Sequence, residues 1–266
     1  MRGTRVWHPA VLLGVIVFLL ATTTAQAERR KPLPELELTF DETFHQTYPL
    51  PSDGTFSLSN VNGSVKVEGW ERDEVEVHAV KTAKKNQSDL KLVRIEVKSE
   101  PKAVQVRTRY PEDEGVEVNV EYRIRVPYHA LLEHVDTVNG TIRVRGIEGK
   151  GDLRSVNGNV EVEDSAGGFS ARTTNGNVQM ELRQLAHNAS MNIETVNGSV
   201  LLALPADSDA DLDVRSMNGE FSSELPVAQP GFLSREFHGR VGHGGGAVRI
   251  RTVNGGIQVV TARPTI

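Results

Sequence analysis

The chain has 266 residues, of which 30 are basic and 35 acidic, and none is cysteine. The lack of cysteine excludes disulfides, a thiol nucleophile, zinc–thiolate sites and lipid attachment through a cysteine. The formal net charge of −5 is mildly acidic and argues against nucleic acid as a partner.

The first 27 residues are typical of a secretory signal peptide. Arg2 and Arg5 form a basic start, an apolar run extends over residues 10–20, and small residues occupy positions 25 and 27. The apolar run is too short for a membrane span. We therefore expect cleavage after Ala27, which leaves 28 basic against 35 acidic residues, a charge of −7. An exported chain without a membrane span, either periplasmic or secreted to the cell surface, is the expectation.

The remainder divides into three parts. Residues 28–54 are expected to form an N-terminal cap or edge strand, and residues 263–266 a short tail. Residues 55–262 form one repeat domain, interrupted at 70–135 by long alternating strands. Turn signals at 100–101 and 111–115 predict that this interruption is an antiparallel β-meander, with a short helix near 86–92.

A pattern [Ser/Thr]-x-Asn-Gly recurs six times, with a variant at residues 60–63. From residue 139 onward the Asn residues are separated by 18, 18, 22, 21 and 36 positions, which suits a coil of two short strands and two turns. Asn and Gly tolerate positive φ, so each pair predicts a corner. The predicted structural corners are Asn62-Gly63, Asn139-Gly140, Asn157-Gly158, Asn175-Gly176, Asn197-Gly198, Asn218-Gly219 and Asn254-Gly255.

Aligning the copies on Asn reveals a period of two on both sides of the corner, as strands with one buried face require. The residues four before, three after and five after each Asn are apolar in every copy except at Ser223. If the coils stack at about 4.8 Å, the Asn side chains can form a hydrogen-bonded ladder beside the Ser and Thr hydroxyls. The pattern predicts an all-β fold, a β-solenoid of two-strand coils with Asn-Gly corners. The alternative is a β-sandwich-like packing of the same strands.

Two outward-facing rows offer binding surfaces. Three residues before the corner Asn come Arg154, Arg172, Arg215 and Arg251, whose stacking would suit repeated anionic groups. Together with the outward Asn159 and Asn177, they are the candidate binding residues. The competing interpretation is surface ion pairing with glutamates 161, 163 and 181, which the pattern favours.

One residue before Asn lies a mostly apolar row, consisting of Val61, Val138, Val156, Val196, Met217 and Val253, with Thr174 as the exception. Either the meander or loops cover it, or it is an exposed stripe for a partner. We expect coverage within the chain.

Other motifs are interpreted as structural. The alternating aspartates of 207–213 lack the Gly and Glu of a calcium loop, and the glycines of 239–246 lack the Lys-Ser/Thr of a P-loop. His238 and His243 have no carboxylate at metal-ligand spacing in the sequence. No Ser-His-Asp arrangement can be assembled, so we expect no catalytic residues, no metal and no cofactor.

The corners, the lead-in Val-Glu-Tyr-Arg-Ile-Arg-Val-Pro at 120–127 and the ending Gly-Gly-Gly-Ala-Val-Arg-Ile-Arg-Thr-Val-Asn-Gly at 244–255 carry a resemblance. Over roughly 55–262 the chain resembles the bacterial "putative adhesin" family, domain of unknown function 4097. The resemblance implies a β-solenoid-like domain in exported or envelope proteins, with adhesion proposed from architecture and no established catalytic residues.

The leading hypothesis is a non-enzymatic protein of the cell envelope that presents a repetitive β surface to a glycan, a cell-wall polymer or a protein partner. One alternative is a structural scaffold that self-associates through its terminal coils. Another is a β-helix enzyme that cleaves glycans.

Overall fold

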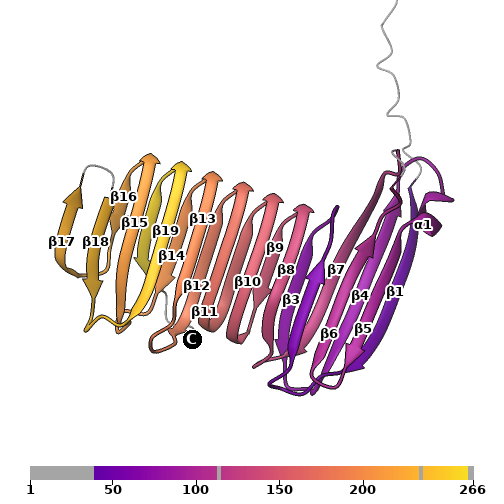
Figure 1. Cartoon of the computed structure of the whole chain (residues 1–266), viewed down its shortest axis with the longest axis horizontal. Helices are drawn as coiled ribbons and strands as arrows, with labels where there is room; N and C mark the ends of the chain where they lie inside the picture. The colour runs from indigo at the N-terminus through magenta and orange to yellow at the C-terminus, as the bar shows by residue number, and fades with distance from the viewer. Residues whose placement is uncertain (1–38, 113–114, 234–235, 263–266) are drawn as a thin grey trace, which may run out of the picture. The chain divides into compact units, whose positions relative to one another are not determined.

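The computed structural model describes residues 39–112, 115–233 and 236–262, without the side chains of 228–233 (Figure 1). The expected signal peptide, residues 28–38 of the expected cap and the tail 263–266 lie outside the described residues. Alternation of apolar and polar residues produces strands along nearly the whole described chain.

The strands that precede the corners form a first sheet, in which the central strands run parallel and the outermost pairs antiparallel. In spatial order the sheet consists of β5 (Arg94–Glu100), β6 (Ala103–Arg109), β2 (Thr55–Ser59), β8 (Leu131–Asn139), β10 (Glu148–Asn157), the later part of β11 (Val160–Asn175), β13 (Met191–Asn197), β19 (Gly246–Asn254), β15 (Ala210–Asn218), β18 (Glu236–Val241) and β17 (Val227–Leu233).

The strands that follow the corners form a second sheet, in which all pairs are parallel except β1–β4 and β4–β7 at one end. Its order is β1 (Phe40–Pro49), β4 (Glu74–Ala83), β7 (Val118–Pro127), β3 (Val65–Trp70), β9 (Ile142–Arg145), the first part of β11, β12 (Val178–Leu185), β14 (Val200–Leu204), β20 (Ile257–Thr261) and β16 (Phe221–Ser223). Strand β11 is long enough to belong to both sheets.

The core lies between the inward faces of the two sheets. The predicted inward residues are buried in nearly every copy, and Phe221 and Ser223, in the outermost coil, are the partly exposed ones. The register pairs equivalent positions of successive copies, so that Asn139, Asn157 and Asn175 are direct neighbours. The predicted β-solenoid with two strands per coil and a common edge of Asn-Gly corners is therefore confirmed.

The spatial order of the coils departs from the order in the sequence at one end. Strand β19 lies between β13 and β15, so the copy at Asn254 is inserted between those at Asn197 and Asn218. The antiparallel strand β18 leads back along β15, and a tight turn with Gly242, Gly244 and Gly245 at positive φ then starts β19. The strands β17 and β18, which lie between the copies at Asn218 and Asn254, account for the long spacing of 36 residues in the sequence.

The region expected to be a meander is antiparallel only in part. In the second sheet β4 is antiparallel to β7 and β1 is antiparallel to β4, and in the first sheet β5 is antiparallel to β6. Strands β6 and β7, however, run parallel to β2 and β3 and so form a further coil of the solenoid. The short helix appears as α1 (Asp89–Leu92) in the connection between β4 and β5.

A buried polar network replaces the Asn-Gly corner next to this extra coil. Asn60 donates from Nδ2 to the carbonyl oxygen of Val120 at 2.9 Å and accepts from the Thr108 hydroxyl at 2.9 Å. The Thr108 and Tyr122 hydroxyls are 2.7 Å apart, and burial raises the pKa of Tyr122. The variant corner at 60–63 is thus the copy that joins the regular coils to the irregular end.

A buried lysine holds α1 over the same end of the core. Lys81 occupies an inward position of β4 and is almost fully buried. Its Nζ donates to the carbonyl oxygens of Leu90 and Val93 at 2.8 and 3.1 Å and lies 2.8 Å from a Glu42 carboxylate oxygen. The ammonium therefore satisfies carbonyls of α1 and the residue after it where the sheets end.

Candidate functional surfaces

The corner asparagines form one continuous ladder along an edge of the stack. The order along the stack is 62, 139, 157, 175, 197, 254 and 218, and from Asn139 onward each Nδ2 donates to the Oδ1 of the preceding asparagine at 2.7–2.9 Å. All six bonds are exposed to solvent. An amide has two N–H donors and an acceptor oxygen with two lone pairs, so each interior rung retains one N–H and one lone pair for an external partner.

The hydroxyls two residues earlier form a second, buried ladder. The Thr173 hydroxyl donates to the Gly158 carbonyl oxygen at 2.8 Å, and the equivalent Ser and Thr residues bond the corner glycine of their neighbouring coil in the same way. The expected proximity of Asn and hydroxyl rows is present, with the hydroxyls inward and the amides outward.

The corner glycines are required for a different reason than the expected positive φ. Among the seven corner glycines only Gly63 and Gly255 have φ in the left-handed region. Instead, a Cβ at any of them would lie 1.9–2.2 Å from a backbone carbonyl oxygen of the adjacent coil. Glycine is therefore selected by the close approach of neighbouring backbones.

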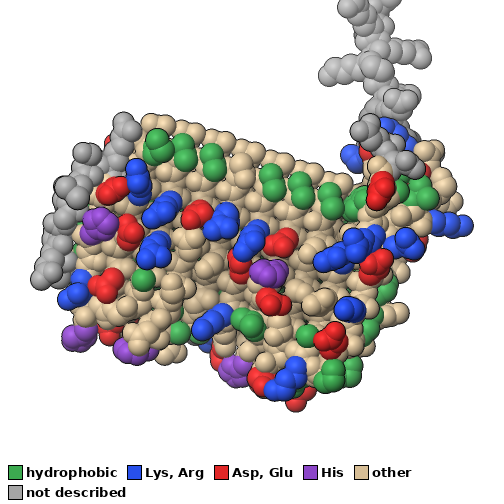
Figure 2. Space-filling model, viewed as in Figure 1, with side chains coloured by type: hydrophobic (Ala, Val, Ile, Leu, Met, Phe, Trp, Pro, Cys, Tyr) green, Lys and Arg blue, Asp and Glu red, His purple; other side chains and the backbone are tan. Residues whose placement is uncertain are grey.

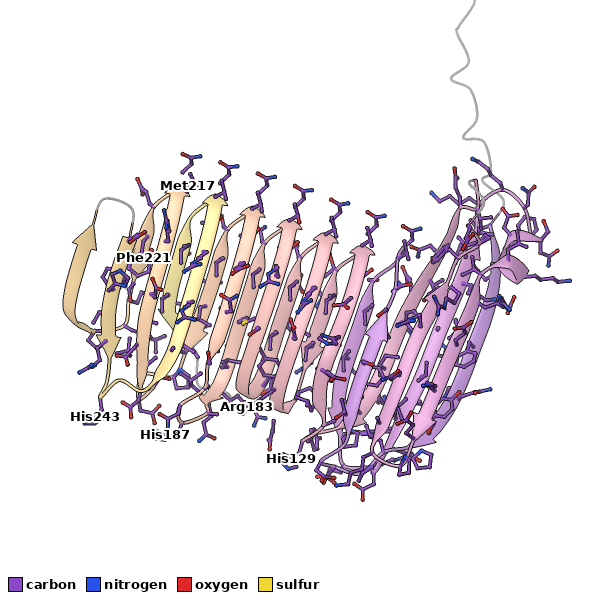
Figure 3. The ribbon with its side chains drawn as sticks, in the orientation of Figure 1. His129, Arg183, His187, Met217, Phe221 and His243 are labelled. Atoms are coloured by element: carbon purple, nitrogen blue, oxygen red, sulfur yellow. The ribbon has the colours of Figure 1, made fainter. Side chains whose placement is uncertain are left out.

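The apolar row that precedes the ladder is exposed, so the expectation that the chain covers it is wrong. Val138, Val156, Val196 and Met217 are 37–46% exposed, which is high for large apolar side chains. Figure 2 shows a line of hydrophobic side chains along one edge, and Figure 3 labels Met217 at this edge. In stacking order the row is Val61, Val138, Val156, Thr174, Val196, Val253 and Met217.

The candidate arginines lie on the same outer face, two residues further from the corner. Register places Arg154 beside Arg172, and Arg251 beside Arg215, with Glu194 between the two pairs. Along a strand two residues span about 7 Å, so the arginine row borders the apolar row directly. Figure 2 shows basic and acidic side chains interspersed over this face.

Three of the four arginines are ion-paired, but not with the expected glutamates. Arg172 Nε lies 2.8 Å from Glu194 and Arg215 Nη1 lies 3.0 Å from Glu236, while Arg154 bonds Asp152 through its Nε and Nη2. The hydrogen bond to Asp152 is the main cause of the raised pKa of Arg154. Arg251 has no carboxylate oxygen within 4.0 Å among the described residues.

The expected partners Glu161, Glu163 and Glu181 belong to the second sheet, because they follow the corner instead of preceding it. Glu161 pairs there with Arg143. The parity argument identified which side chains point outward but could not say which of the two outer faces they occupy.

The structure does not bring Asn159 and Asn177 together with the arginines. They follow the corner and lead into the second sheet, where Asn159 Oδ1 accepts from the Asn177 backbone N–H and Asn177 Oδ1 accepts from that of Ser199. These bonds, at 2.9 and 2.8 Å, give both side chains a role in stacking the coils.

The aspartates of 207–213 and the glycine-rich turn are partners of one another. Asp209 Oδ1 accepts from the His243 backbone N–H at 2.7 Å, and this bond is the main cause of the lowered pKa of Asp209. Asp211 pairs with Arg240, and Asp213 lies 3.5 Å from His238. Among the described residues no group of three or more His, Asp or Glu is placed to hold a metal ion.

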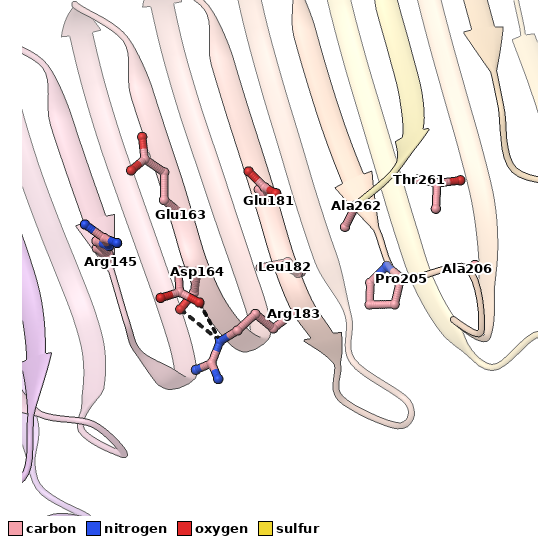
Figure 4. Close-up of a pocket in the computed structure, with 10 residues that line it drawn as sticks. All are labelled: Arg145, Glu163, Asp164, Glu181, Leu182, Arg183, Pro205, Ala206, Thr261 and Ala262. Atoms are coloured by element: carbon pink, nitrogen blue, oxygen red, sulfur yellow. Dashed lines mark hydrogen bonds and ion pairs between the residues drawn. The ribbon is translucent and has the colours of Figure 1, made fainter. Parts of the chain in front are cut away.

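A hollow that the sequence analysis missed lies on the outer face of the second sheet, with a volume of about 720 Å³ (Figure 4). Charged side chains of β9, β11 and β12 line one part of it, and the smaller side chains of Pro205, Ala206 and Ala262 line another. Asp164, at φ 47°, lies at a β-bulge and pairs with Arg183 at 2.9 Å. Figure 3 labels Arg183 at the edge opposite the ladder. The rim offers hydrogen-bonding groups of both charges.

The fold and these surfaces define a class of protein, a two-sheeted β-solenoid whose corners are fixed by an asparagine ladder. The sequence matches the Toastrack family, domain of unknown function 4097, over residues 46–260. Because the match covers most of the chain, the chain belongs to this family. No curated protein matches the chain.

Solved structures with a similar arrangement are distant in sequence. A protein of Clostridium sporogenes described as a "putative cell adhesion protein" is 12% identical with a TM-score of 0.43, and covers 83% of this chain and 100% of its own. A "putative adhesin" of Bacteroides fragilis is 8% identical with a TM-score of 0.41, covering 83% and 97%. A "putative lipid binding protein" of Parabacteroides distasonis is 10% identical with a TM-score of 0.25, covering 84% and 97%.

Within the described residues, no helix has the length and apolar character needed to cross a membrane.

Proposed function

We propose that the chain is an exported, non-enzymatic protein of the cell envelope that binds an extended partner, foremost an acidic glycan or cell-wall polymer. The proposed contact surface is the corner face, defined here as the apolar row, the arginine row and the asparagine ladder. The main support for the proposal is that the apolar row is exposed and lies between the arginine row and the asparagine ladder, all three of which run along the stack.

The chemistry of the corner face matches an acidic polysaccharide. Sugar rings present C–H surfaces that pack on valine methyl groups, and hydroxyls that can use the spare donor and acceptor of each ladder amide. Neighbouring coils repeat at about 4.8 Å, so a long partner meets a ladder amide at every corner, a valine or methionine at most corners and an arginine at four of them. Repetition multiplies weak contacts into useful affinity.

The ion pairs of the arginine row leave it available to an anionic partner. Exposed pairs such as Arg172–Glu194 contribute about 0–1 kcal/mol each, so a carboxylate or sulfate on a polymer can compete for the guanidinium. Arg251 forms no ion pair within 4.0 Å among the described residues, although its charge contributes to the lowered pKa of Glu194.

Binding can be tested with a glycan array on the exported chain, followed by analysis of products to detect cleavage. The triple variant Val138→Thr, Val156→Thr and Val196→Thr imitates the natural Thr174 and should weaken binding while the fold is kept. Leu131→Thr is the matched control, because Leu131 is 38% exposed on β8 but at the end of that strand remote from Val138. Equal binding by the triple variant and the control would reject the corner face.

The arginine row needs its own variant. Alanine at Arg154, Arg172 and Arg215 should reduce binding of acidic glycans and leave neutral glycans unaffected. Acidic-glycan binding that survives this triple change removes the arginines from the proposal. Released oligosaccharides in the product analysis would favour the glycan-cleaving alternative instead.

The alternative of a self-associating scaffold is favoured by one observation. Strands β1, β5, β16 and β17 each pair on one side only within the described residues, which leaves unpaired edges at both ends of the stack. Light scattering over a wide concentration range tests it: growth of dimers or filaments supports the scaffold, and a constant monomer mass rejects it.

A further inference from the structure

A row of basic side chains crosses the outer face of the second sheet at the end away from β16. The register pairs His45 with His78, His78 with Arg123, Arg123 with Lys66 and Lys66 with Arg143. Four of these side chains, His78, Arg123, Lys66 and Arg143, alternate with buried neighbours and therefore point outward. The exposed His45 lies beside His78, with the two ring centroids 5.6 Å apart. The cationic row, as we call these five residues, spans five adjacent strands without an acidic member.

The next row on the same face provides an internal comparison. Two residues along the strands, the register gives Glu76, Arg125, Glu68, Arg145 and Glu163, with strictly alternating sign. Opposite charges that face each other across strands are stabilising, whereas like charges directly opposite are destabilising. The alternating row is what stability alone favours, so the cationic row is an exception that requires a reason.

Arg123 and Lys66 of the cationic row form no ion pair with the carboxylates that the structure describes. His45 at one end lies 2.9 Å from Glu76, and Arg143 at the other end pairs with Glu161. For Arg123 and Lys66, neighbours in register, no carboxylate oxygen of the described residues lies within 4.0 Å.

These cations line a hollow of about 330 Å³ together with His78, Glu68 and Glu76. Glu76 already has two partners, because one of its oxygens lies 2.9 Å from His45 and the other lies 3.2 Å from Arg125. Glu68 lies between Arg125 and Arg145 in the alternating row. The carboxylates are thus compensated by other groups, and the charge of Arg123 and Lys66 is left over.

We propose that Arg123 and Lys66 bind an oxyanion of the phosphate or sulfate type, with His78 as a third hydrogen-bonding group. A guanidinium presents a planar fork that bonds two oxygens of such a group, and the lysine ammonium adds a second positive charge beside it. Adjacent strands are about 4.8 Å apart, so one tetrahedral anion can contact both side chains. The site is on the other sheet from the corner face and does not depend on the function proposed there.

The anion can belong to a soluble polymer or to a lipid headgroup, and the experiment separates these sources. Wild-type protein is titrated with long-chain polyphosphate, with inorganic phosphate as competitor, and is sedimented with vesicles of phosphatidylglycerol or of phosphatidylcholine. Binding to polyphosphate alone indicates a soluble ligand. Sedimentation with phosphatidylglycerol alone indicates a lipid surface, and either result supports the oxyanion site.

The test variant is Lys66→Gln with Arg123→Gln. The matched control is Lys98→Gln with Lys102→Gln, which removes the same formal charge from the β5–β6 hairpin, where these lysines pair with Glu100 and Asp53. A charge-assisted contact is typically worth about tenfold in affinity, so we expect roughly 10- to 100-fold weaker anion binding by the test variant. The control should bind within about twofold of wild type.

Thermal unfolding shows whether the test variant keeps its fold. Because the substitution removes two like charges that face each other across β3 and β7, the variant should melt no lower than wild type. The proposal is overturned if wild-type protein binds none of the probes, or if the test variant and its control lose affinity equally.

Discussion

Replacing a corner glycine by alanine tests the physical reason for the repeat. At Gly158 a Cβ would lie 2.0 Å from the Gly140 carbonyl oxygen and 2.5 Å from its carbon. Both are backbone atoms, so the two coils must separate at the corner.

The separation would affect three bonds that join these coils. Gly140 N donates to the Asn157 carbonyl oxygen at 3.0 Å, the Ser155 hydroxyl to the Gly140 carbonyl oxygen at 2.9 Å, and Asn157 Nδ2 to Asn139 Oδ1 at 2.9 Å. At about 1 kcal/mol each, their loss lowers the free energy of unfolding by about 3 kcal/mol. For a chain of this size the melting temperature should fall by roughly 6–12 °C.

Urea unfolding followed by circular dichroism measures the change, with Gly256→Ala as the control. At Gly256 a Cβ would meet its nearest neighbour, the Glu220 carbonyl oxygen, at an ordinary 3.5 Å, so we expect a change of at most about 1 kcal/mol. Gly158→Asn should be as harmful as Gly158→Ala, because φ at Gly158 is outside the left-handed region. Equal stability of Gly158→Ala and Gly256→Ala would refute the close-approach argument.

Three further changes test other parts of the fold. Thr173→Val keeps the shape but removes the donor to the Gly158 carbonyl oxygen, and should cost about 1–2 kcal/mol in urea unfolding; no loss would mean that the hydroxyl ladder is incidental. Lys81→Met leaves the Leu90 and Val93 carbonyls without their donor, so amide hydrogen exchange should accelerate selectively at residues 88–93. A loss of about 1.4 kcal/mol corresponds to a roughly 10-fold faster exchange. Exchange that accelerates equally along the whole chain would contradict this role of Lys81. Burial is the main cause of the raised pKa of Asp136, and its Oδ1 is buried without a hydrogen-bond partner. The ionised carboxylate therefore lowers the stability of the fold at pH values above the folded-state pKa. Below the pKa of Asp136 in the unfolded chain, this destabilisation is absent. Asp136→Asn should therefore stabilise the protein by about 1 kcal/mol or less at neutral pH and have no effect near pH 3, and an equal effect at both pH values would exclude titration as the cause.

The regular coils could be predicted because each contains complete local information. The period-two pattern on both sides of the corner identified the inward faces, and the repeated Asn gave the register, as the pairing of Asn157 with Asn139 and Asn175 shows. The sequence could not show which corner glycines have positive φ, because glycine is also required where neighbouring backbones approach closely, as at Gly158. Both requirements produce the same residue in the sequence.

Non-local features were beyond the sequence. The coil of β6 and β7 has no Asn-Gly pair, because Asn60, Thr108 and Tyr122 supply the corner bonds from three separate segments. The partners of the arginines depend on which outer face each glutamate occupies. The cationic row becomes visible only when the register places His45 and His78 beside Arg123, across strands that are far apart in the chain.

The position of β19 between β13 and β15 has a consequence for how the protein is made. During synthesis, residues 210–225 leave the ribosome before residues 246–261, yet their coil has its main parallel contacts with β19 and β20. The layer of β19 and β20 is therefore translated after both of the layers that flank it. Until it is made, β13 and β14 lack their native neighbours on this side, so the native order of this end cannot be built by simple addition from the amino terminus.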